Sequence, residues 1–128
     1  MKLYQRTIRD LHQMLVDREI SSVELTDAVF NQIDAVGDKT KAYLLVTRDL
    51  ALRQAKSADE RLRAKGDIQP LTGIPIALKD VLCVKDVAST AGSKILQGFI
   101  PPYSATVVER LEREGAVFLG KTNCDEFA

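Results

Sequence analysis

Hydrophobic positions recur every three or four residues in the first third of the chain. Residues 7–18 show this spacing, which predicts an amphipathic helix. Ser21 followed three residues later by Glu24 is a capping-box pattern and predicts the start of a second helix, which we expect to end at Gly37. The first 40 residues are therefore predicted to be helical.

From residue 42 onward, short apolar runs alternate with helical patterns. Residues 42–47, 74–79 and 116–119 are short and apolar, which predicts three strands. A stripe of small residues at helical spacing predicts a helix over 49–65, and a shorter helix is expected over 106–115. The order strand, helix, strand is typical of sheets whose strands run mostly in one direction.

This order of elements predicts an α/β fold. Residues 1–40 would form N-terminal helices, and residues 41–128 would form part of a mostly parallel or mixed sheet covered by helices. A sheet of only three strands, with both faces meant to be covered, is small and leaves open edges. We therefore expect residues 1–128 to be the N-terminal part of a single domain whose remainder lies outside this sequence.

Composition excludes several classes of function. With 45% hydrophobic and 28% charged residues, the 128-residue chain has a globular balance. Its 18 basic and 18 acidic residues cancel, which argues against direct nucleic-acid binding. No apolar run approaches the ~20 residues that span a bilayer, so no membrane association is expected. Cys83 and Cys124 lack metal-ligand spacing and are expected to be reduced thiols of a cytoplasmic protein.

The single histidine limits the chemistry available to this chain. His12 lies in the first predicted helix, so neither a histidine-based triad nor a zinc site with several imidazoles can be built from these residues. A hydrolytic site would need Lys, Asp, Glu or Tyr as its base. No metal ligands are expected.

Lys79 is the candidate for that base. It stands at the end of the apolar run 74–79, which is typical of a buried strand, and burial of an unpaired ammonium costs several kcal/mol. The side chain could reach water or a carboxylate such as Asp80. Alternatively, it could give up its proton and act as a base. The residue types alone leave both alternatives open.

Residues 115–122 match the phosphate-loop pattern G-x-x-x-x-G-K-[ST] letter for letter. That loop requires a preceding strand and flexible residues between the glycines. Here a predicted helix precedes Gly115, and the intervening residues are Ala, Val, Phe and Leu, which favour a buried strand. We therefore interpret Gly115 as a helix end and residues 120–123 as a turn, and we reject a nucleotide site.

Two further stretches carry polar groups. Residues 88–93 are small and hydroxylated and could supply hydroxyls and amides to a site, although a plain loop is the simpler interpretation. Asp125 and Glu126 could act as paired carboxylates, or could simply favour the N-terminus of a helix through its dipole.

Several separate motifs together resemble the amidase signature family. They are the segments 70–80, 93–96, 101–111 and 115–128. The resemblance implies a Ser–cis-Ser–Lys triad that hydrolyses amides, with Lys79 as its lysine. In that family the two serines and a glycine-rich oxyanion hole lie further along the sequence than residue 128. Residues 1–128 alone would then be inactive.

Within the family, the motifs are most similar to those of the glutaminase subunits of tRNA-dependent amidotransferases. This likeness implies hydrolysis of glutamine, with the ammonia used to convert Glu-tRNA(Gln) to Gln-tRNA(Gln). The partners would be the B and C subunits. ATP and Mg would be used by the complex through its partner chains, with no cofactor in this chain. A stand-alone amidase acting on a small amide, and a non-catalytic binding domain, are the alternatives.

Overall fold

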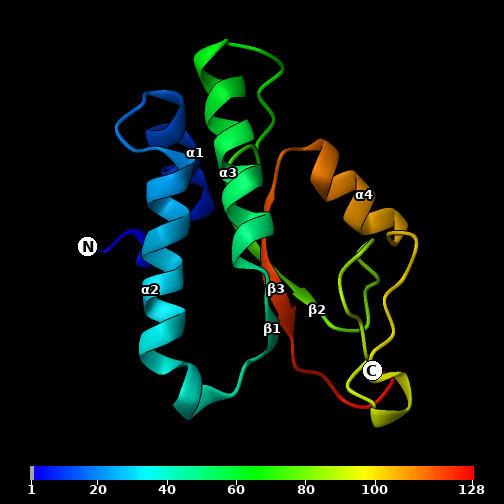
Figure 1. Ribbon diagram of the computed structural model, residues 1–128. Coiled ribbons are helices and arrows are strands. Elements are labelled where there is room, and N and C mark those ends of the chain that lie inside the picture. The colour runs from blue at the N-terminus through cyan, green and yellow to red at the C-terminus, as the bar shows by residue number, and fades with distance from the viewer. Residues whose placement is uncertain (1) are drawn as a thin grey trace.

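The computed structural model describes residues 2–128 as helices and strands in alternation (Figure 1). The helices are α1 (Ile8–Val16), α2 (Ser22–Thr40), α3 (Arg48–Arg63) and α4 (Thr106–Arg113), with short 3-10 turns η1 (Leu3–Gln5) and η2 (Lys94–Leu96). The strands are β1 (Tyr43–Val46), β2 (Pro75–Lys79) and β3 (Val117–Thr122). Within residues 2–128, no helix is long and apolar enough to cross a membrane.

The three strands form one mixed sheet in the order β1-β3-β2. The last strand in the sequence, β3, is central, and its residues from Val117 to Lys121 are buried. It runs parallel to β2 and antiparallel to β1. The predicted α/β class with a mostly parallel or mixed sheet is thus confirmed, and the antiparallel β1 makes the sheet mixed.

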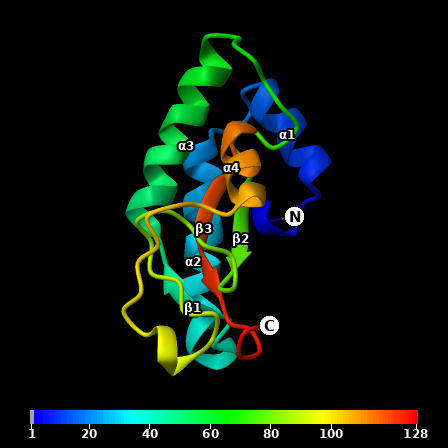
Figure 2. The same ribbon diagram turned by 90° about the vertical axis from the view of Figure 1, so that its right-hand side faces the viewer.

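Helices cover the sheet on both faces. Figures 1 and 2 show α2 and α3 on one side of the strands, and α4 with the long segment after β2 on the other. On the first side, Phe30 of α2 packs with Ala51 and Ala55 of α3 against Val117 and Leu119 of β3. On the α4 side, a separate cluster joins the sheet to the helix, and its buried members are Leu78, Val84, Val108, Ala116 and Phe118. The central strand therefore contributes to both cores.

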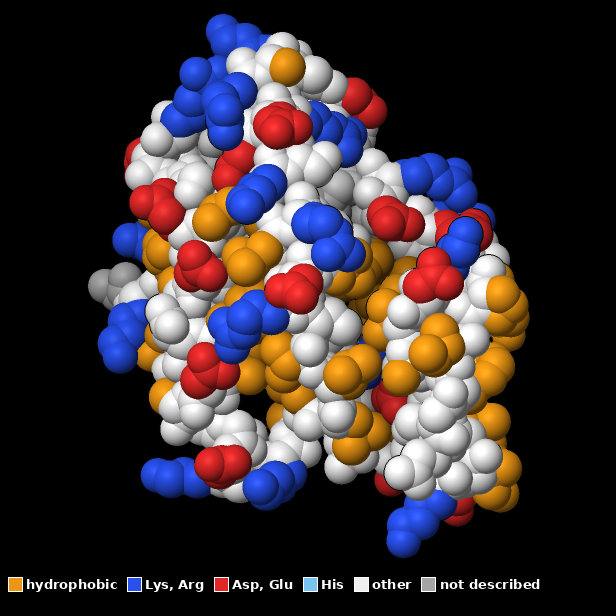
Figure 3. Space-filling view, viewed as in Figure 1, with side chains coloured by type: hydrophobic (Ala, Val, Ile, Leu, Met, Phe, Trp, Pro, Cys, Tyr) orange, Lys and Arg blue, Asp and Glu red, His pale blue; other side chains and the backbone are white. Residues whose placement is uncertain are grey.

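The outer surface has a charged part and an apolar part (Figure 3). Basic and acidic side chains intermix over the helices on one side of the sheet. Four large exposed apolar side chains lie in η2 and the segment between η2 and α4, namely Ile95, Phe99, Ile100 and Tyr103. The segment after β2 thus presents apolar surface that nothing in residues 2–128 covers.

The capping box that begins α2 is present as predicted. Ser21 Oγ accepts a hydrogen bond from the Glu24 amide, and the Glu24 carboxylate accepts one from the Ser21 amide. The predicted end of this helix at Gly37 is wrong, because the helix continues to Thr40 and ends where Lys41 adopts a left-handed conformation. A glycine inside a helix costs only about 1 kcal/mol, and the flanking residues sustain the hydrogen-bond ladder.

The turn expected at residues 120–123 is also wrong. Strand β3 continues through Gly120 and Lys121 to Thr122, with a register irregularity against both neighbouring strands. Gly120 makes this possible because a Cβ there would collide with the backbone of Leu45 in β1. A glycine in a strand interior often marks such a close backbone approach.

Strand β2 lies at an edge of the sheet, not in its interior. The strand predicted over 74–79 is present, but its burial is one-sided: Leu78 is buried, whereas Ala77 and Lys79 are exposed. Alternate residues of a strand point to opposite sides, so Ala77 and Lys79 share a side that no element within residues 2–128 covers.

A pair of glycine substitutions tests the close approach of β1 and β3. Gly120→Ala should lower the free energy of unfolding by about 1–3 kcal/mol, because the added methyl group forces β1 away from β3. Gly37→Ala is the matched control: it lies in α2 with no atom within 4 Å of the new Cβ, and should raise stability by about 0.5–1 kcal/mol. Urea unfolding followed by circular dichroism measures both. Equal effects of the two substitutions would contradict this packing.

Candidate functional site

The carboxyl ends of the parallel strands β2 and β3 lie side by side. Leu78 is in register with Lys121, and Lys79 with Thr122. Asp80 follows directly, and its amide donates to the Thr122 carbonyl at 3.0 Å. Functional groups in sheets with parallel strands gather at this edge. The topology therefore brings Lys121 next to a carboxylate that lies 41 residues away in the sequence.

Lys121 is the buried lysine of this cluster. It is 1% exposed, and its Nζ lies 2.8 Å from Asp80 Oδ1 and donates at 2.6 Å to Ser89 Oγ. Burying an ammonium is tolerable only when it is paired and hydrogen-bonded. Asp80, itself 2% exposed, and Ser89 supply those partners.

Asp80 is anchored through all of its polar atoms. Its Oδ2 accepts hydrogen bonds from the Thr90 amide at 3.0 Å and from Thr90 Oγ1 at 2.5 Å. Its carbonyl accepts the Ala91 amide at 3.1 Å, and its own amide is bonded to β3. Residue 80 is thus tied to the central strand on one side and to the segment 88–93 on the other.

The environment of Asp80 favours its charged form. Burial alone would raise the pKa of the carboxyl group, but the hydrogen bonds from Lys121 and Thr90 and the positive charge of Lys121 outweigh burial and hold its pKa below the usual value. Because the folded pKa is lowered, the pair stabilises the fold above the pKa of the unfolded chain, and this contribution is lost as the pH falls through the folded pKa.

The segment 88–93 is a loop that supplies hydroxyl groups to this cluster. Ser89 and Ser93 are both buried. Ser93 Oγ donates to Glu126 Oε1 at 2.6 Å, and the Phe127 amide donates to the Ala91 carbonyl at 2.8 Å. The loop interpretation of this run is therefore confirmed, and its hydroxyls bond Asp80 and Lys121. The carboxylate of Glu126 is bound to this loop. Residues 123–128 form no helix, so Asp125 and Glu126 do not mark a helix N-terminus.

Lys79, the lysine singled out by the sequence, is exposed. The expectation that it lies at the end of a buried strand is wrong for residues 2–128, because β2 is an edge strand and the side that carries Lys79 is open. Asp80 is also not its partner, since that carboxylate binds Lys121. What the structure does fix is its backbone: the Lys79 carbonyl accepts the Leu82 amide at 2.9 Å.

Lys121 is the polar residue of the cluster that sequence reasoning missed, whereas Ser89 lies in the hydroxylated run 88–93 that it had pointed out. The sequence pattern places Lys121 in a turn because a glycine precedes it. A signal for its role was available: a lysine that continues an apolar strand needs a buried anion, and Asp80 follows a neighbouring strand. The pairing of β2 with β3, which connects the two, is not visible in the pattern.

The phosphate-loop pattern at 115–122 does not form a loop. Most of it is strand β3, and its lysine, Lys121, forms the buried ion pair with Asp80. Residues 2–128 also hold no group of three or more His, Cys, Asp or Glu side chains placed to bind a metal ion. Cys83 and Cys124 are free cysteines.

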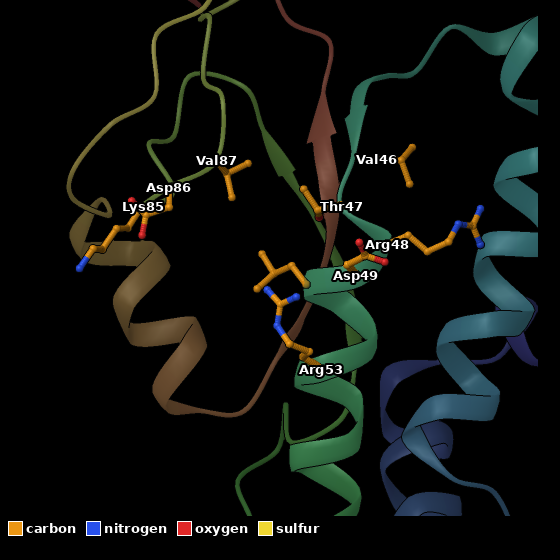
Figure 4. Close-up of a pocket in the computed structure, with 9 residues that line it drawn as sticks. Val46, Thr47, Arg48, Asp49, Arg53, Lys85, Asp86 and Val87 are labelled. Carbon is orange, nitrogen blue, oxygen red and sulfur yellow. The ribbon is translucent and has the colours of Figure 1, made fainter.

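Lys79 lines neither of two hollows that lie near the sheet. One of about 500 Å³ lies between the start of α3 and residues 85–87, and Arg53, Asp49 and Lys85 give it mixed charge (Figure 4). The other, of about 340 Å³, lies beside the loop of the cluster and is lined in part by Thr90, Ser93 and Asn123. The second hollow thus lies between β1, the carboxyl end of β3 and the loop 88–93.

Comparison with known proteins gives consistent similarities. The sequence model of the family named Amidase matches residues 24–128. The A subunit of the glutamyl-tRNA(Gln) amidotransferase of Dehalococcoides mccartyi is 52% identical over 126 residues, and that of Geotalea daltonii is 51% identical over 128 residues. These alignments cover 98% and 100% of this chain, but each covers 26% of the relative. The chain therefore spans about a quarter of the length of these relatives.

Solved structures give the same result. The peptide amidase of Stenotrophomonas maltophilia superposes with a TM-score of 0.91 at 37% identity, over 97% of this chain and 26% of that chain. A fatty acid amide hydrolase superposes with a TM-score of 0.87 at 27% identity, over 94% of this chain and 21% of that one. The predicted fold class is confirmed by these neighbours, which share this arrangement of helices and strands over about a quarter of their length.

Removing one partner of the buried pair tests its electrostatics. Lys121→Met leaves the Asp80 carboxylate buried without its cation and should lower the free energy of unfolding by about 3–5 kcal/mol at neutral pH. Asp80→Asn combined with Lys121→Met removes both charges and should recover most of that loss. Urea unfolding of the two variants and the parent chain measures the difference. A double variant as unstable as the single one would contradict the pairing.

Proposed function

Because this chain belongs to the amidase family, we propose that it is the N-terminal part of the glutaminase subunit of a tRNA-dependent amidotransferase. In this proposal the glutaminase hydrolyses glutamine and releases ammonia. The B and C subunits are its partners, and the complex uses ATP and Mg, bound by a partner chain, with that ammonia to convert Glu-tRNA(Gln) to Gln-tRNA(Gln). No cofactor is assigned to residues 1–128, and the proposed location is the cytoplasm.

The choice of the amidotransferase subunit over other members of the family rests on sequence identity. The relatives named as A subunits of the amidotransferase share about half of their aligned residues with this chain over nearly its whole length, for example 52% over 126 residues. The peptide amidase shares 37%. A stand-alone amidase is therefore the less favoured assignment. The zero net charge of the chain is consistent with tRNA binding by a partner.

The proposed base is Lys79. It stands at the carboxyl end of the apolar strand β2, and the resemblance of the surrounding motif to the amidase signature family assigns it the place of the lysine in the Ser–cis-Ser–Lys triad. The uncharged amine would accept a proton from the nucleophilic serine through the bridging serine. The serine oxygen would attack the side-chain amide carbon of glutamine, and the proton held by Lys79 would return through the bridging serine to the leaving nitrogen, so that ammonia departs. Water, deprotonated in the same way, would then release glutamate from the acyl-enzyme. Both serines would have to come from sequence outside residues 1–128.

The exposure of Lys79 fits this proposal on one condition. A lysine acts as a general base near neutral pH only when its surroundings favour the uncharged amine. Residues 2–128 do not bury the Lys79 amine, because the side of β2 that carries Ala77 and Lys79 is open. This chain covers only 26% of its relatives' length, so the remainder of such a domain is available to cover that side. The chain alone is proposed to be inactive.

A chimera tests the proposed function. Residues 1–128 would replace the corresponding segment of the Dehalococcoides mccartyi relative, assembled with its partner subunits. Ammonia release from glutamine should occur in the parent chimera, and Lys79→Ala should lower it at least about 100-fold, because general acid–base catalysis contributes about 10²–10⁴. Lys56→Ala removes an exposed lysine of α3 and is the matched control, with turnover expected within twofold of the parent.

Two results would contradict the proposal. A Lys79→Ala chimera that keeps its glutaminase turnover would exclude Lys79 as the base. A parent chimera that hydrolyses small amides equally well with and without the partner subunits, and does not prefer glutamine, would instead identify a stand-alone amidase.

A further inference from the structure

We infer that the buried Asp80–Lys121 pair, together with Ser89, is a positioning element that fixes where Lys79 stands during catalysis. The inference rests on the proposed role of Lys79 as the base. It assigns a function in the reaction to residues that neither touch substrate nor exchange protons with it.

The contacts of Asp80 support this assignment. Asp80 follows Lys79 directly, and each of its polar atoms is bonded: the amide to Thr122, the carbonyl to Ala91, one carboxylate oxygen to Lys121 and the other to Thr90. The end of β2 is therefore joined by side chains to both the central strand and the loop 88–93. Such a junction leaves the backbone at Lys79 little freedom to move.

Burial rules out a direct chemical role for the pair in this arrangement. Lys121 is 1% and Asp80 2% exposed, and their charged atoms face each other at 2.8 Å. Ser89 Oγ accepts a second hydrogen bond from the ammonium at 2.6 Å. Neither charge can reach a substrate without breaking the cluster. The pair can act on the reaction only through the neighbouring residue, Lys79.

Stability alone does not account for a pair of this kind. Replacing a buried ion pair by uncharged residues of similar volume is often neutral or stabilising, so a buried pair is weak support for a purely structural role. Positioning of the catalytic group is a stronger reason for such a pair, because a displacement of about 1 Å of that group can lower the rate about 100-fold. Within residues 2–128, Lys79 lies on an edge strand, and apart from this junction that strand is fixed to the sheet only by its backbone pairing with β3.

The test measures turnover per folded molecule in the chimera. Asp80→Asn combined with Lys121→Met removes the charged link between β2 and β3, while the asparagine oxygen can still accept from Thr90. We expect kcat for glutamine hydrolysis to fall about tenfold or more, with KM within twofold of the parent. The matched control is Glu109→Gln with Arg113→Gln, an exposed pair of α4 at 3.8 Å, for which kcat and KM should not change.

Ser89→Ala provides a second, milder variant. It keeps both charges and removes one hydrogen bond from Lys121. We expect kcat to fall about threefold at an unchanged KM, with a lower melting temperature because one donor of the buried ammonium loses its partner. If the double variant does not fold, Ser89→Ala decides the question, because its ion pair is intact.

The outcomes separate the two proposals. If Lys79→Ala abolishes turnover but the folded double variant, or Ser89→Ala in its place, keeps the parent kcat, the positioning role is excluded and the proposed function stands. If Lys79→Ala itself keeps turnover, the proposed function fails, and the positioning role fails with it. A loss of melting temperature with an unchanged kcat per folded molecule would mean that the cluster is structural only.

Discussion

One buried ion pair sets the geometry of the carboxyl end of this sheet. Lys121 of β3 and Asp80 after β2 face each other at 2.8 Å, and both are almost completely removed from water. The other ion pairs found within residues 2–128 are more exposed and contribute little. Charges buried to this degree must satisfy each other, so the two strands and the loop 88–93 are held in one arrangement.

The elements of the fold could be predicted from the sequence because their signals are local. The Ser21–Glu24 capping box and the alanine stripe of α3 depend only on neighbouring residues, and both features are present in the structure. The errors lie where a partner distant in sequence decides the outcome. Gly120 continues a strand because β1 approaches it closely, and nothing in residues 115–123 indicates that approach.

In the candidate site, too, features set by local sequence could be predicted, and those set by distant partners could not. The sequence identifies Lys79 from its place after an apolar strand, but an apolar run predicts burial without any knowledge of strand order. The strand order β1-β3-β2 places β2 at an edge, and this exposes Lys79 while burying Lys121. Strand order depends on which strands pair, and periodicity contains no information on pairing. For that reason the pattern alone assigns the buried lysine to a turn.

We propose that Lys79 stands on an anchored strand end whose open side is covered by the rest of an amidase-family domain. Amine labelling followed by mass spectrometry tests this directly in residues 1–128 and in the full-length chimera. We expect Lys79 to be labelled rapidly in residues 1–128 and to be protected in the chimera. Exposed Lys56 should react equally in both, and buried Lys121 in neither. Equal labelling of Lys79 in the two proteins would show that the rest of the domain leaves this side of β2 open.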